Sequence, residues 1–128
     1  TGKGQHVDIG MLDVTVSMLA NQGMNYLATT KVPPRLGNNH PNIVPYQVMQ
    51  ASDGHFVLSV ANDSTFARFC SVAGREDLLD DPRCATAVAR VTHRTHVTKV
   101  CNGITRRRST SWWLEHLAVA KVGRSPIL

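Results

Sequence analysis

The stretch VPYQVMQASDGHFVLSVA, residues 44–61, decides how most of this chain folds. Two runs of strand-favouring residues, 44–49 and 55–61, flank an Asp-Gly pair, and this arrangement is the strongest short-range signal for a β-hairpin. Because side chains alternate between the two faces of a strand, Phe56 and Leu58 are expected to share one apolar face. A hairpin alone is marginally stable in water, so other elements must cover that face.

The residues after the hairpin show helical patterns. Asn62 and Asp63 are both good N-cap candidates for the helix that follows, and Gly74 is a natural C-terminal stop for that helix. A short helical turn comes next, and further helices are expected over about 91–104 and over 109–123, before an extended end. The apolar stripes of the three helices hold Phe66, Phe69 and Cys70; Val97, Val100, Cys101 and Ile104; and Trp113, Leu117 and Ala120.

The residues before the hairpin form a different pattern. QHVDIG, residues 5–10, alternates like a short strand, and apolar residues then recur at helical spacing over 11–29. Gly23 interrupts this long helix at a cost of about 1 kcal/mol relative to Ala. A Pro-Pro pair forbids its continuation and opens a connector, residues 33–45, which proline makes stiffer than a Gly/Ser linker.

These patterns together predict an α+β fold, made of a long helix, a Pro-rich connector and an antiparallel hairpin that three C-terminal helices cover. The expected organisation has three parts. Residues 1–32 hold the first strand and the long helix, residues 33–45 are a stiff connector, and residues 46–128 hold the hairpin and the three helices.

Composition limits the classes of function. The chain has 128 residues, 42% of them apolar, and a formal net charge of +5, which favours an anionic partner such as a phosphate-bearing ligand. The run at 106–108 is the main cluster of arginines, and a short run of this kind usually lies at a solvated helix end. No leader and no apolar run of about 18 residues is recognised, so a soluble, cytoplasmic protein without membrane contact is expected.

Several chemistries are disfavoured by spacing. His93 and His96 share a helix face and Cys101 lies near them, but the usual zinc patterns are missing, so no metal site is expected. The cysteines lack a CxxC pair and are expected to be free, buried thiols. No G-x-S-x-G motif marks a nucleophile. Trp112 and Trp113 point about 100° apart on a helix, so no nucleic-acid partner is expected.

The order of five stretches is specific. The chain resembles the class III CoA-transferase family in TGKGQHVDIGMLDV at 1–14, PPRLGNNHPNIVPYQV at 33–48, ASDGHFVLSVAND at 51–63, FARFCSVAGREDLLDDPRCAT at 66–86 and RVTHR at 90–94. That family includes formyl-CoA transferase, carnitine CoA-transferases and α-methylacyl-CoA racemase. The resemblance extends over nearly all of the chain.

The resemblance implies a place for each part of the chain. Residues 1–32 would match the edge of a large CoA-binding domain, and residues 46–128 the small domain. The connector would fix one domain against the other beside the cleft where acyl-CoA reacts. Its polar residues, together with the start of the first strand, are then the candidates for that cleft, while the alternative is that the amides only cap turns. These candidates are Asn38, Asn39, His40 and Tyr46.

The resemblance also implies what these residues lack. An Asp of the family's transferases attacks the thioester, but it belongs to a segment that precedes TGKGQ, so no catalytic residue is expected here. Coenzyme A is the family's substrate, and no resident cofactor is expected. The sequence departs from the family pattern at Cys84, where Phe is usual, and at Thr95 and His96, where an acidic pair is usual.

Three hypotheses follow. The first is a truncated CoA-transferase-like chain that is inactive alone. The second is an interaction module that forms a homo-oligomer through the apolar face of the helix at 11–27. The third is weak binding of an acyl-CoA by the basic surface and the polar groups of the cleft.

Overall fold

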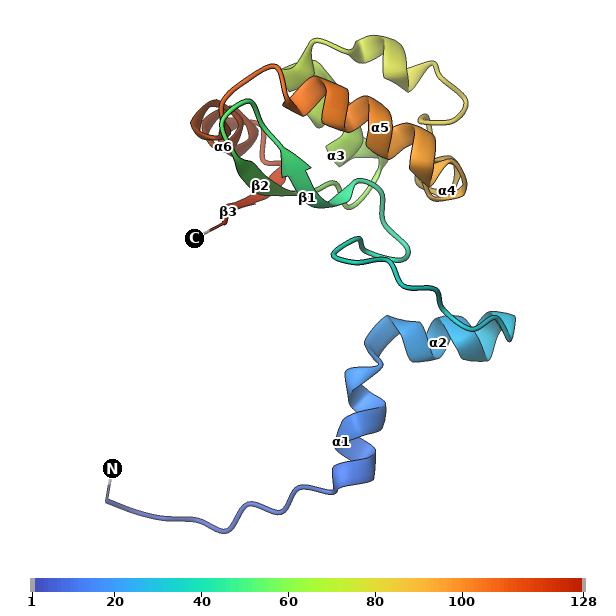
Figure 1. Cartoon of the computed structure of the whole chain (residues 1–128), viewed down its shortest axis with the longest axis vertical. Helices are drawn as coiled ribbons and strands as arrows, with labels where there is room; N and C mark the ends of the chain where they lie inside the picture. The colour runs from blue at the N-terminus through green and yellow to red at the C-terminus, as the bar shows by residue number, and fades with distance from the viewer. Residues whose placement is uncertain (1, 128) are drawn as a thin grey trace. The chain divides into compact units, whose positions relative to one another are not determined.

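The computed structural model describes residues 2–127 and divides the chain into two compact units, residues 1–35 and residues 36–128 (Figure 1). The first unit is helical, and the second contains a sheet with helices. Within the described residues, no helix is long and apolar enough to cross a membrane.

The first unit holds two short helices, α1 (Met11–Met18) and α2 (Ala20–Thr29). The expectation of one long helix is therefore wrong, and Gly23 lies inside α2 and does not break it. The break lies at Ala20, whose φ of 46° falls in the left-handed region that a side chain disfavours. Neither helix buries a residue, so neither has the tertiary packing that normally sustains a long helix.

The strand expected at 5–10 is also absent, because these residues have no regular structure. An alternating pattern marks a strand only where a neighbouring strand can pair with it. All described strands lie in the second unit, and their sheet includes no residue of the first.

The second unit contains a three-stranded antiparallel sheet of order β1-β2-β3. The hairpin prediction is confirmed, because β1 (Tyr46–Gln50) pairs with β2 (His55–Ser59) and places Val48 opposite Val57. The extended end of the chain supplies β3 (Gly123–Pro126), which pairs with β2 from its other side. Sequence reasoning predicted the extension but not this pairing.

In the part of the chain that the structure describes, five helical elements follow the hairpin: α3 (Asp63–Ala73), the 3₁₀ turn η1 (Glu76–Leu79), α4 (Ala87–Thr92), α5 (Arg94–Thr105) and α6 (Thr110–Val119). Of the two N-cap candidates for α3, the structure selects Asn62, whose side chain accepts from the Thr65 N–H, while Gly74 ends the helix at a φ of 61° as predicted. The helix predicted at about 91–104 is two helices, α4 and α5, which meet at His93.

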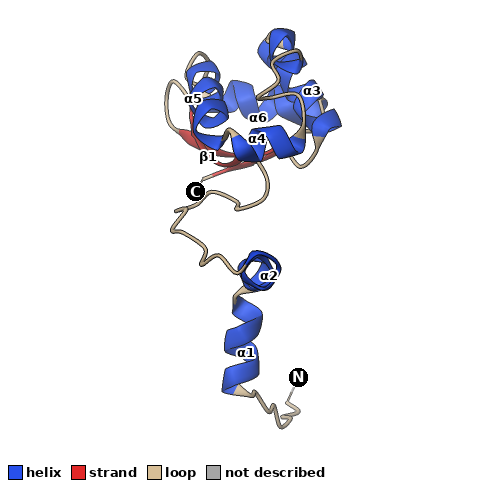
Figure 2. Ribbon diagram, turned by 90° about the vertical axis from the view of Figure 1, so that its right-hand side faces the viewer, coloured by secondary structure: helices blue, strands red, loops and turns tan. Residues whose placement is uncertain are grey.

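The helices of the second unit gather on one face of the sheet (Figure 2). Phe56 and Leu58 point into this core with no exposed surface, as their alternation predicts, while Val57 on the opposite face is half-buried. Trp113 of α6 packs beside two aromatic rings, with its ring centroid 6.2 Å from those of Phe56 and Phe69. The α+β class is therefore confirmed, with a sheet of three strands.

Candidate functional site

A buried arginine fixes the end of the connector to the second unit. Arg90, on α4, is 1% exposed and lies with its guanidinium 4.4 Å from the centre of the Phe66 ring. Its nitrogens donate to the carbonyl oxygens of Val44 at 3.0 Å and Cys84 at 2.9 Å, and to the carboxylate of Asp63 at 2.8 Å. One side chain thus joins the connector, α3 and the loop before α4.

Three of the four predicted cleft residues lie together along the start of β1. The Asn38 side-chain oxygen accepts from the Val48 N–H at 3.0 Å, and the His40 N–H donates to the Tyr46 carbonyl at 2.9 Å. The His40 and Tyr46 rings stack, with centroids 5.2 Å apart and planes 8° from parallel. These contacts hold the connector against the edge of the sheet.

The polar atoms of this group are used mostly for local structure. The Asn38 side-chain oxygen accepts the hydrogen bond of a backbone N–H on the open edge of β1, and Nδ1 of His40 accepts from the Asn42 N–H at 3.1 Å. Asn39 contributes its backbone N–H to a turn closed by the Leu36 carbonyl. Tyr46 is 37% exposed, so its ring is the one most open to a ligand.

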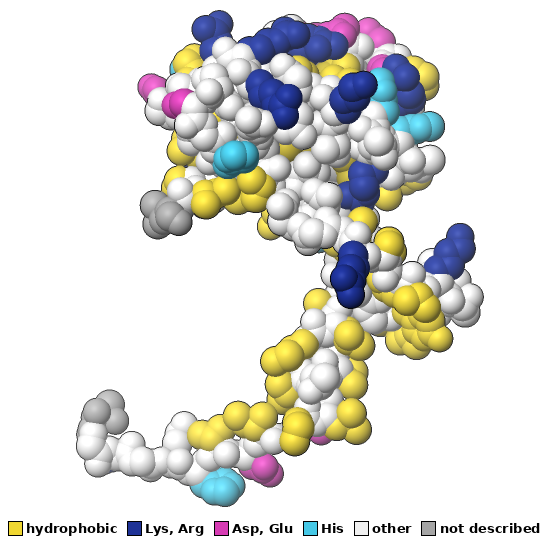
Figure 3. Space-filling view, viewed as in Figure 1, with side chains coloured by type: hydrophobic (Ala, Val, Ile, Leu, Met, Phe, Trp, Pro, Cys, Tyr) yellow, Lys and Arg dark blue, Asp and Glu magenta, His cyan; other side chains and the backbone are white. Residues whose placement is uncertain are grey.

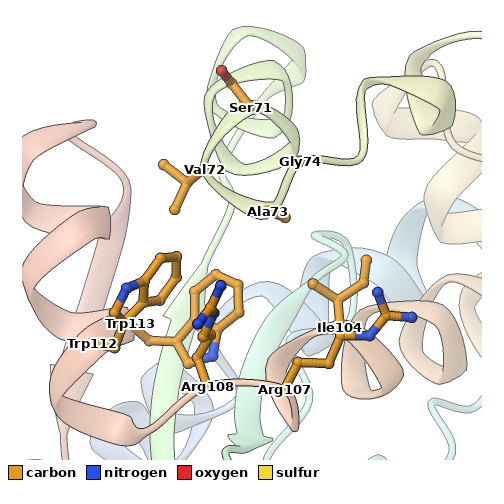
Figure 4. Close-up of a pocket in the computed structure, with 9 residues that line it drawn as sticks. All are labelled: Ser71, Val72, Ala73, Gly74, Ile104, Arg107, Arg108, Trp112 and Trp113. Carbon is orange, nitrogen blue, oxygen red and sulfur yellow. The ribbon is translucent and has the colours of Figure 1, made fainter.

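A cavity of about 440 Å³ lies between the end of α3 and the turn from α5 to α6 (Figure 4). The guanidinium of Arg108 lies 5.3 Å from the Trp112 ring centre. Ile104 and Val72 contribute apolar side chains to the cavity wall. A cationic group beside an aromatic ring suits a planar anion. The sequence places the arginine run beside the tryptophans, but only the fold brings the end of α3 over them to form the cavity.

A third group combines Asp81, Cys84 and His96. One ligand-type atom of each lies within 4.8 Å of the other two. The sequence places His96 near His93 and Cys101, but the loop after η1 brings Asp81 and Cys84 to it instead.

Cys101 is not part of this group. Burial raises the pKa of its thiol to about 12, as expected of a core residue.

Arg83 controls the charge at this third group. Its guanidinium donates to both oxygens of Asp81, at 3.0 and 2.8 Å, and its backbone N–H donates at 2.8 Å. These hydrogen bonds hold the pKa of the Asp81 carboxyl well below its usual value. Asp81 is therefore an anion at neutral pH.

Comparison with known proteins identifies the chain. The model of CoA-transferase family III matches residues 1–128. The chain belongs to this family. As a CoA-transferase family III chain, it has a fold that also occurs in a solved structure, a CaiB/BaiF family protein from Brucella suis. That structure is 42% identical, with a TM-score of 0.74, and the match covers 99% of this chain and 34% of the other.

Two curated relatives give the extent of the match. The succinate–glutarate CoA-transferase of Agrobacterium fabrum is 48% identical over 100 residues, which are 78% of this family III chain and 25% of the relative. The acetyl-CoA:oxalate CoA-transferase of Acetobacter aceti is 34% identical over 128 residues, which are all of this chain and 33% of the relative. The chain spans a quarter to a third of the relatives' length.

Proposed function

We propose that these 128 residues form the small domain of a CoA-transferase together with the adjoining helical segment, and do not transfer CoA on their own. The proposal rests on the exposure and the hydrogen bonds of the Asp and Glu side chains. Eight of the nine acidic side chains are exposed, and the ninth, Asp81, is bound by Arg83. A carboxylate that attacks a thioester needs a site that orients it and excludes water. The described residues offer none.

The relatives support a substrate class for the complete enzyme. The two relatives described above are named for succinate with glutarate and for acetyl-CoA with oxalate, so each name includes at least one short dicarboxylic acid. We therefore assign to the complete enzyme the movement of CoA to or from a short dicarboxylic acid. In it, this segment supplies the hairpin domain, and Arg90 and Asn38 hold the connector in place against that domain.

A graft tests this function. The segment of the Agrobacterium enzyme that matches this chain is replaced by the corresponding residues of this chain, and succinyl-CoA and glutarate are supplied. The graft should transfer CoA, whereas the isolated chain should show no turnover. A folded graft without activity would contradict the transferase assignment. Turnover by the isolated chain that is lost on changing one of its own acids would instead contradict the proposed inactivity.

The exposed apolar surface of the first unit favours a second function, self-association through the segment at 11–27. Met11, Leu12 and Met18 are 82%, 76% and 76% exposed, and Figure 3 shows hydrophobic side chains along this unit. An apolar surface of this kind is typical of an interaction site. Light scattering at high micromolar concentration should give a dimer or a larger oligomer.

A matched pair of variants distinguishes association through this surface from nonspecific association through any exposed apolar side chain. Leu12→Asp should shift the chain toward the monomer, whereas Val119→Asp, at an equally exposed position of α6, should leave the mass unchanged. A wild-type monomer, or equal effects of the two variants, would count against self-association through 11–27.

The cavity beside Trp112 favours a third function, weak binding of coenzyme A or its esters. Arg107 and Arg108 place two cations at a wall that also carries an aromatic ring, and the ligand carries phosphates and a planar base. Millimolar CoA should raise the Tm of the wild type and raise it less in Arg108→Ala. The charge-matched control Lys31→Ala lies in the first unit and should behave as the wild type. No shift in the wild type would refute this function.

A further inference from the structure

Asp81, Cys84 and His96 converge from two separate segments and have no part in the proposed function. Asp81 and Cys84 lie in the loop between η1 and α4, and His96 lies in the first turns of α5. Nε2 of His96 is 3.7 Å from Oδ2 of Asp81. One ligand-type atom from each of the three residues lies within 4.8 Å of the other two.

The imidazole of His96 has an unexplained feature. Its Nε2 atom is inaccessible to solvent, yet it forms no hydrogen bond with any described residue. Buried polar atoms in folded proteins nearly always have a partner, so an orphan of this kind calls for an explanation. The nitrogen lies beside the two other ligand-type groups, and a cation placed among the three would give it a partner.

The three groups differ in chemistry in a way that suits one class of ion. Thiolate sulfur, imidazole nitrogen and carboxylate oxygen are the ligand types of Zn²⁺, whereas Mg²⁺ and Ca²⁺ prefer oxygen alone. A carboxylate and a thiolate together balance two positive charges. We propose that Asp81, Cys84 and His96 form a three-ligand site for zinc or a similar divalent transition-metal ion.

Binding requires only a small local rearrangement. Tetrahedral zinc, with bonds of about 2.0–2.3 Å, places its ligand atoms roughly 3.5 Å apart, so the widest pairs must close by about 1 Å. The Cys84 thiol loses its proton to solvent as the sulfur–metal bond forms. The side chains of Asp81 and His96 are 17% and 34% exposed, so the proposed ion approaches from their solvent-facing side and takes a water as its fourth ligand.

Two other interpretations fit the geometry less well. A nucleophilic Cys-His pair needs a sulfur that a substrate can reach, but Cys84 has no exposed surface. A simple His-Asp ion pair is weak here, because 3.7 Å is too long for a hydrogen bond and Arg83 already occupies both oxygens of Asp81. Arg83 can keep its hydrogen bonds while a metal uses a remaining lone pair of Asp81.

Cobalt(II) tests the site because its spectrum reports its ligands. The full chain, reduced and free of metal, is titrated with Co²⁺, and the thiolate-to-cobalt absorption in the near ultraviolet is recorded with the visible bands of tetrahedral cobalt. One ion per chain should produce both, and Zn²⁺ should abolish both by displacement. Cys84→Ser should lose the thiolate band, and His96→Gln should raise the Kd for Co²⁺ by at least about tenfold.

Matched variants decide whether the ion occupies this site. His93→Gln removes a histidine one turn earlier, and Cys70→Ala removes another thiol, so both should bind as the wild type does. His96→Gln alters a partly exposed side chain and is expected to fold even if Cys84→Ser does not, and circular dichroism of the metal-free variants checks this. Saturation without a thiolate band, or a Kd that His96→Gln and His93→Gln change equally, would overturn the proposal.

Discussion

Arg90→Met should destabilise the second unit strongly. The substitution keeps a long apolar stem against Phe66 but removes the donors to the carbonyls of Val44 and Cys84. A buried acceptor without a donor costs about 1–3 kcal/mol, so two such losses lower the free energy of unfolding by about 3 kcal/mol. The pair with Asp63 adds little to this figure, because that carboxylate is 58% exposed.

Urea denaturation followed by tryptophan fluorescence measures this effect, because both tryptophans lie in the second unit. A loss of about 3 kcal/mol corresponds to a fall of about 10–25 °C in the Tm of a domain this size. The control is Arg75→Met, which breaks a surface pair with Asp77 and should cost less than about 1 kcal/mol. Equal losses in the two variants would refute the view that Arg90 is a buried anchor.

Three further outcomes are expected from the second unit. The N–H and hydroxyl of Thr110 donate to the Asp53 carboxylate and lower its pKa below the ordinary value of 3.8. The stability that this interaction adds to the folded state is therefore fully present above pH 3.8, and it is lost as the pH falls through the pKa of Asp53 in the folded protein. Urea midpoints at neutral and acid pH should show this loss in the wild type, and Asp53→Asn should reduce it. Burial raises the pKa of the Cys70 thiol to about 12, so a thiol reagent at pH 8 should label it only after unfolding, as mass spectrometry of peptides can establish. In Gly74→Ala the added methyl group would contact no neighbouring atom, but the alanine would have to adopt the positive φ of the helix cap. The free energy of unfolding in urea should therefore fall by about 1 kcal/mol, and an unchanged midpoint would contradict the left-handed cap.

Local signals in the sequence were enough for the hairpin and for α3. The Asp-Gly turn, the alternation at Phe56 and the caps at Asn62 and Gly74 each act over a few residues, and each prediction is confirmed. The break at Ala20 has no such signal, because neither the apolar spacing nor Gly23 marks it. Helical spacing shows which residues can share a face, but it cannot show whether anything packs on that face.

The features that join distant segments could not be predicted from spacing. Arg90 carries a charge and would normally be placed on the surface, and only the fold brings two carbonyls and Asp63 to it. The same holds for His96, which pattern matching compared with its neighbours on one helix, whereas its partners Asp81 and Cys84 come from a loop. The candidate cleft residues were found from family motifs, and their use as substrate contacts stays a prediction.

The pairing of β3 with β2 has a consequence for shortened versions of this protein. Phe56 to Ser59 lie in the middle of the sheet only because residues 123–126 return from the far end of the unit. A version ending before Gly123 would leave that row of backbone donors and acceptors open, beside the most apolar strand of the fold. Such an edge is a template for a neighbouring chain, so fragments of this kind should precipitate or form fibres.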